Sequence, residues 1–115
     1  MNKSTIHMSA QKQKSLQEIY DIIHLNRGTE QVCKTLQNIN DVEIWTLVYE
    51  KFFFRNGSYA SLTIVLTEFA DKQTAVLAAS GGGEGVFNFS WFAEQDYVNS
   101  CANALKECGF ETTQF

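Results

Sequence analysis

The stretch from Ile44 to Phe69 reads IWTLVYEKFFFRNGSYASLTIVLTEF and decides the fold. Two runs within it, 44–54 and 59–69, are rich in β-branched and aromatic residues, which favour strands. Between the runs stands Asn56-Gly57, a dipeptide that tolerates the positive φ angles of a tight hairpin turn. The stretch therefore predicts two antiparallel strands joined by a hairpin.

A two-residue turn at Asn56-Gly57 also predicts which residues of the two strands face each other. Successive side chains of a strand point to opposite faces of the sheet, so the pairs divide into two sets. The more apolar set is expected to meet the helices: Phe53 with Ala60, Lys51 with Leu62, Tyr49 with Ile64, and Leu47 with Leu66. The other set mixes polar and aromatic groups: Phe54 with Tyr59, Phe52 with Ser61, Glu50 with Thr63, and Val48 with Val65.

Two helices are predicted before the hairpin. From Gln11 the apolar residues Leu16, Ile19, Tyr20 and Ile23 recur at helical spacing, and Arg27-Gly28 is expected to end this helix. Thr29 can cap a second helix, in which Val32, Leu36 and Ile39 would point inward. Residues 38–41 are expected to break that helix before the strands begin.

Two more strands and a last helix are predicted after the hairpin. Residues 74–79 form a run of small apolar residues, and residues 86–91 alternate between apolar and polar groups as a half-buried strand does. From about Ala93 to Cys108 the spacing is helical, and Gly109-Phe110 is expected to close the helix. The predicted fold class is α+β: a four-stranded antiparallel meander with two N-terminal helices and one C-terminal helix, in the order α-α-β-β-β-β-α.

Length and charge limit the number of domains and the classes of partner. The 115 residues suit one domain, expected over residues 11–115, with residues 1–10 as a flexible polar tail. The net charge of −4 and the scattered lysines and arginines argue against nucleic acid and against an anionic membrane surface. No stretch approaches the ~20 apolar residues of a membrane span.

The three cysteines do not predict a disulfide framework, because their number is odd. Cys101 and Cys108 lie seven residues apart on one predicted helix, which is too far for a bridge. None of the three, Cys33 included, has the C-x-x-C or histidine spacing of a zinc site. Without a signal peptide pattern either, we expect a cytoplasmic protein with core cysteines, no metal and no cofactor.

Short motifs in the second half of the chain resemble a known family. They are Val48-Tyr49-Glu50-Lys51-Phe52, the hairpin glycine Gly57, Ser80-Gly81-Gly82-Gly83, and Val86-Phe87. Together they resemble a domain-of-unknown-function family of small bacterial α+β proteins, over roughly residues 43–105. The resemblance implies the strand–hairpin–strand fold and a C-terminal helix, and it implies no activity.

The glycine cluster Gly81–Gly85 is the most unusual stretch. It lacks the lysine of a P-loop and leads into a predicted strand, so a wide hairpin turn is the favoured interpretation over an anion-binding loop. If instead it covers a pocket, the residues expected to bind a small molecule are Tyr49, Glu50, Ser80, Gly81, Gly82, Gly83 and Trp91. Neither Ser80 nor any other residue stands in a motif that predicts a catalytic set.

Phe52, Phe54 and Tyr59 gather at one end of the predicted hairpin, on its less apolar face. If the helices leave that face uncovered, the rings form an exposed patch of the kind that marks an interface, and if the helices cover it, they are core residues. The sequence thus favours a non-enzymatic interaction module, pairing as a homodimer through the aromatic sheet face or a strand edge. The alternative is a small-molecule-binding protein or enzyme with a pocket beside Gly81–Gly85.

Overall fold

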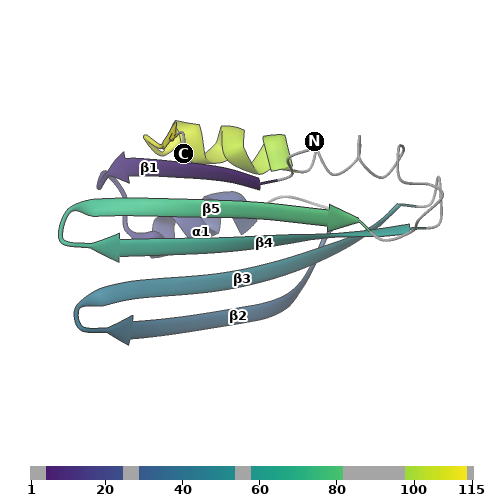
Figure 1. Cartoon of the computed structure of the whole chain (residues 1–115), viewed down its shortest axis with the longest axis horizontal. Helices are drawn as coiled ribbons and strands as arrows, with labels where there is room; N and C mark the ends of the chain where they lie inside the picture. The colour runs from purple at the N-terminus through teal and green to yellow at the C-terminus, as the bar shows by residue number, and fades with distance from the viewer. Residues whose placement is uncertain (1–4, 25–28, 54–57, 82–97, 114–115) are drawn as a thin grey trace.

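A six-stranded antiparallel sheet and two helices make up the computed structural model, which describes residues 5–24, 29–53, 58–81 and 98–113 (Figure 1). The elements in chain order are β1 (Thr5–Gln11), α1 (Leu16–His24), β2 (Glu30–Ile39), β3 (Val42–Phe53), β4 (Ser58–Phe69), β5 (Lys72–Gly81), a C-terminal helix over residues 98–107, and β6 (Glu111–Thr112). The strands lie side by side in the order β2-β3-β4-β5-β1-β6. The α+β class with an antiparallel sheet is confirmed, but four strands and the order α-α-β-β-β-β-α are wrong.

The central hairpin of β3 and β4 is confirmed, with a register two residues away from the predicted one. Tyr49 lies opposite Leu62 and Leu47 opposite Ile64. The predicted register was wrong because four residues, 54–57, separate the paired residues Phe53 and Ser58, instead of two. A shift of two residues keeps every side chain on its face, since the period of a strand is two.

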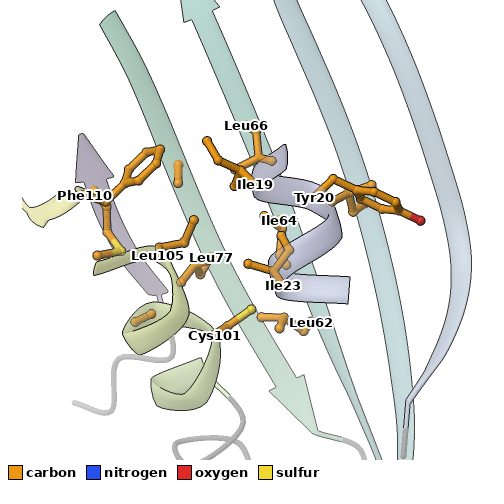
Figure 2. Packing of buried hydrophobic residues seen from close by; sticks show 14 of the residues in the cluster. Ile19, Tyr20, Ile23, Leu62, Ile64, Leu66, Leu77, Cys101, Leu105 and Phe110 are labelled. Carbon is orange, nitrogen blue, oxygen red and sulfur yellow. The ribbon is translucent and has the colours of Figure 1, made fainter. Parts of the chain in front are cut away.

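The core lies between one face of this sheet and the two helices. Figure 2 shows α1 and the C-terminal helix side by side over the same face, with their apolar side chains directed at the strands. The buried apolar residues of β3 and β4 lie on the face that the sequence predicted to be apolar, and those of β5 continue this face: Trp45, Leu47, Tyr49, Ala60, Leu62, Ile64, Leu66, Ala75, Leu77 and Ala79. We call this the covered face, and the opposite side of the sheet the open face.

Residues 5–10, which were expected to form part of a flexible tail, lie in β1. This strand pairs with β5, where Met8 lies opposite Ala75, and Met8 is only 1% exposed. Thr5, His7 and Ser9 alternate with Ile6, Met8 and Ala10. That alternation has the period of a half-buried strand. The prediction of a flexible tail did not take this signal into account.

The predicted second helix is wrong, because residues 30–39 form strand β2. They pair with β3 through nearly their whole length, and Asn40-Asp41 connects the two strands with φ angles of 51° and 68°. Positive φ at both central residues is typical of a type I′ hairpin turn, and asparagine and aspartate tolerate it. The break predicted at residues 38–41 is therefore the end of a strand pair and not of a helix.

The start of α1 and the end of the C-terminal helix follow local sequence signals. Ser15 Oγ accepts a hydrogen bond from the Glu18 amide at 3.1 Å, and the Ser15 amide donates to Glu18 Oε1 at 2.8 Å, which is a capping box. At the other end of the chain, Phe110 N donates to Leu105 O and Gly109 N to Lys106 O. These bonds form a Schellman motif at the residues predicted to close the helix, with Gly109 at φ 96° and Phe110 buried. The predicted strand 86–91 and the first turns of the predicted last helix lie outside the described residues.

Candidate interaction surface

Strand β2 forms one edge of the sheet, since its only neighbour among the described strands is β3. It is ten residues long, whereas β6 at the opposite edge has two. Four large apolar side chains are exposed in the described part of the chain, and three belong to β2: Val32 (48%), Leu36 (50%) and Ile39 (51%). A long edge strand with apolar side chains is a template for pairing with another strand. We call β2, with these three residues, the β2 edge.

The sequence predicts these three residues inside the protein, on a helix. A signal for the strand does exist in the β-branched and sulfur residues Val32, Cys33 and Thr35, which precede a dipeptide suited to a hairpin turn, Asn40-Asp41. The spacing of Val32, Leu36 and Ile39 also fits a helix, and for this reason the sequence predicted a helix in place of an edge strand.

The covered face holds β2 in place from one side. The hydroxyls of Tyr20 in α1 and Tyr49 in β3 both donate to Gln31 Oε1, at 2.8 and 3.3 Å. The Lys34 ammonium lies 4.3 Å from the centre of the Tyr20 ring and 5.6 Å from that of Trp45. Lysine on an edge strand usually discourages pairing, but this one lies over the aromatic rings of the covered face.

Strand β2 pairs regularly with β3 over residues 33–39. Each of these residues has a single partner in β3, from Cys33 opposite Val48 to Ile39 opposite Val42. The register shifts between Gln31 and Cys33, as a β-bulge at Val32 would cause. The regular segment therefore offers seven residues for pairing, and the irregular one lies at one end.

The open face is the second candidate surface, and no described helix lies on it. Half-buried apolar residues occupy its centre, namely Ile44, Val48, Val65, Val76 and Ala78. Threonines interleave with them: Thr35, Thr46, Thr63, Thr67 and Thr74. A mixture of this kind is compatible with water, because antiparallel sheets commonly keep one face solvated. The open face therefore has less need of a partner to cover its apolar side chains than the β2 edge has.

The residues predicted to bind a small molecule are divided between the two faces. Tyr49 is buried on the covered face, while Glu50 is exposed on the open face. Ser80 lies in the same row as Glu50, with Ser61 between them, and Ser80 Oγ is 3.1 Å from Ser61 Oγ. Gly81 ends β5 opposite Ala60. Gly82, Gly83 and Trp91 lie outside the described residues. The described members therefore do not converge on one point.

The residues of the predicted aromatic patch are only partly placed. Phe52 in β3 lies opposite Tyr59 in β4, so the backbone brings these two together. Their side chains, and the whole of Phe54, lie outside the described part of the structure. The aromatic patch stays a prediction.

A shallow cavity of about 320 Å³ lies at the opposite end of β5 from Gly81. Its lining is mostly polar: Ser9, Ala10, Gln11, Gln13, Lys72, Gly109 and Glu111. Lys72 and Gly81 are nine residues apart on one strand, which corresponds to roughly 30 Å. This cavity is therefore not the pocket predicted beside the glycine cluster.

The thiols and carboxylates of the described residues show no reactive cluster. Burial raises the pKa of the Cys101 thiol to about 12, and burial also raises the pKa of Cys108. Cys33 is half-buried on β2, so the prediction that all three cysteines are core residues is wrong for this one. Among the described residues, no three His, Cys, Asp or Glu side chains are grouped as metal ligands would be.

Comparisons with known proteins agree with the resemblance noted in the sequence. The model of a family described as "Family of unknown function (DUF6054)" matches residues 1–109. No curated protein matches the chain. None of the described helices has the length and apolar character needed to cross a membrane.

Proposed function

The chain belongs to the DUF6054 family, a family of unknown function, and from this premise we propose that it is a non-enzymatic interaction module that forms a homodimer. The observation that carries the proposal is the β2 edge, where three of the four exposed large apolar side chains of the described residues lie on one strand. A second copy would cover these side chains and satisfy the outward N–H and C=O groups of β2.

The division of the predicted ligand residues supports an interaction module over the small-molecule alternative. Tyr49 and Glu50 follow each other along β3, so their side chains point to opposite faces and cannot line one pocket. A pocket beside Gly81–Gly85, which would favour a binding protein or an enzyme, stays a prediction.

A cytoplasmic location is part of the proposal. Cys33, Cys101 and Cys108 are all free thiols, and free thiols suit a reducing compartment. The bacterial origin that the resemblance implied also stays a prediction.

Sedimentation velocity at rising protein concentration tests the homodimer. We expect the wild type to be a dimer at micromolar concentration and Leu36→Lys to be a monomer, because two added charges would meet at the interface. Phe69→Lys is the matched control, since Phe69 is equally apolar and 56% exposed but lies on β4, away from β2. It should remain a dimer.

A wild type that stays monomeric at high micromolar concentration would contradict the proposal. If Leu36→Lys remains a dimer and Phe52→Ala becomes a monomer, the homodimer stands but uses the aromatic sheet face in place of the β2 edge.

A further inference from the structure

We propose that two copies pair antiparallel along β2, about a two-fold axis that passes through Leu36, so that their sheets join into one. This inference rests on the proposed homodimer and names the contact that forms it. In the joined sheet, β2 of each copy would lie between its own β3 and β2 of the other copy.

The regular part of β2 places Leu36 at its centre. Residues 33–39 pair one to one with β3, so three regular residues lie on each side of Leu36. The register shift before Cys33 and the turn at Asn40-Asp41 bound this segment. A symmetric pairing about Leu36 therefore uses every regular residue and leaves the irregular one, Val32, outside.

The same register places each side chain beside a compatible partner. Leu36, which is on the covered face opposite Trp45, would meet Leu36 of the second copy. Directly opposite residues of an antiparallel pair lie on the same face, so the helices of both copies stay on one side of the joined sheet. On the open face, Cys33 would lie opposite Ile39 of the other copy, and Thr35 opposite its Gln37.

Charge and the regularity of β2 disfavour the registers centred on Lys34 and on Thr35. Lys34 is the only charged residue between 33 and 39, and pairing about Leu36 sets it opposite Asn38 of the second copy. An axis at Lys34 would place two ammonium groups opposite each other, which is destabilising. An axis at Thr35 would set Lys34 against Leu36 and draw the irregular residue Val32 into the paired segment.

Disulfide trapping tests the register, in a Cys33→Ser background. Directly opposite residues have Cα atoms about 4.5–5.5 Å apart, within the range of a disulfide. We therefore expect Leu36→Cys to oxidise to a covalent dimer. Thr35→Cys alone and Gln37→Cys alone should not, because each residue lies ~8 Å from its own copy across the axis.

An equimolar mixture of the Thr35→Cys and Gln37→Cys proteins should nevertheless yield the mixed covalent dimer, since these two positions are opposite each other. Each single variant is thus the control for the mixture. Cys101 and Cys108 are 2% and 1% exposed and should stay reduced in all samples. Circular dichroism of each reduced variant establishes that it is folded.

The outcomes separate this inference from the proposed function. Covalent dimers of Thr35→Cys alone would overturn the Leu36 axis in favour of one at Thr35. A wild type that sediments as a dimer, with no cross-link from Leu36→Cys or from the mixture, would overturn the β2 pairing and leave the homodimer standing. A monomeric wild type would overturn both.

Discussion

Leu36 and Leu66 occupy one row of the covered face, on either side of Trp45, yet their surroundings differ completely. Leu66 in β4 is fully buried, whereas Leu36 in β2 is half exposed. Both are leucines on strands and both point to the same side of the sheet. The difference shows that the helix layer buries the middle of the sheet and leaves Leu36 half exposed.

This contrast has a consequence for the β2 edge. Leu66 gains its burial from the chain's own helices, but these helices leave Leu36 half exposed, so its further burial needs a contact outside the described layers. The apolar character of Leu36 is thus explained if a second copy covers it, and the difference between the two leucines can be tested directly.

The largest effect is expected from shortening the two leucines separately. Leu66→Ala removes buried methyl groups and leaves a cavity, which should lower the free energy of unfolding by about 2–5 kcal/mol. Leu36→Ala should lower that of the monomer by less than ~1 kcal/mol, because the side chain is already half in water. Urea unfolding at low protein concentration measures both values. Equal losses at the two sites would mean that Leu36 is as buried as Leu66.

A smaller effect is expected where β2 is attached to the covered face. Gln31→Ala removes the oxygen that accepts from both Tyr20 and Tyr49, and should cost about 1–2 kcal/mol. The substitution should accelerate amide hydrogen exchange in β2 more than it accelerates exchange in β4. Gln37→Ala is the control, since Gln37 is exposed on the open face, and it should leave the exchange unchanged. A uniform loss of protection across the sheet would contradict a local attachment.

The smallest effect is expected at the charged rim of the covered face, next to Leu66. Lys12 Nζ lies 2.8 Å from Glu68 Oε2, and the buried amide of Gln73 donates to Glu68 Oε1 at 2.9 Å. Burial by itself would raise the pKa of Glu68, but the hydrogen bonds from Lys12 and Gln73 and the charge of Lys12 outweigh it and lower that pKa. The ionised carboxylate therefore stabilises the folded chain more than the unfolded chain.

The direction of the pH dependence follows from this lowered pKa. The stabilisation is fully present above the ordinary value of 4.5 and is lost as the pH falls through the lower pKa of the folded state. The melting temperature of Glu68→Gln should consequently fall less steeply below pH 4.5 than that of the wild type. Lys12→Gln should flatten the same limb, and the double variant should flatten it no further. Additive effects would show that the two side chains act separately.

The faces of the central hairpin were predictable even though its register was not. The turn dipeptide Asn56-Gly57 indicated a pairing two residues away from the observed one, yet Leu47, Tyr49 and Leu62 lie on the predicted face. A strand pattern determines which side chains share a face, and an even shift preserves it. The exact partner of each residue depends on the length of the connection.

The candidate site was predictable only as a kind of surface. The hypothesis of pairing through a strand edge named no strand, because residues 30–39 were assigned to a helix. The pairing of residues 30–39 with β3 in the structure identifies them as an edge strand.

The sequence by itself determined the features that depend on neighbouring residues. These are the apolar stripe of α1, the close of the C-terminal helix at Gly109 and Phe110, and the faces of β3 and β4. Each is set by contacts within one turn or by the alternation of one strand.

Only the tertiary structure decided that residues 5–11 and 30–39 form strands, and how far Leu36 is exposed. A strand takes its hydrogen bonds from a partner distant in the chain, so residues 5–11 become a strand through β5 and residues 30–39 through β3. Whether a leucine on the covered face is then buried depends on how far the helix layer reaches across the sheet. Leu66 is fully buried and Leu36 is half exposed. The sequence did not predict this difference, because no local pattern records the width of a layer built by two helices from opposite halves of the chain.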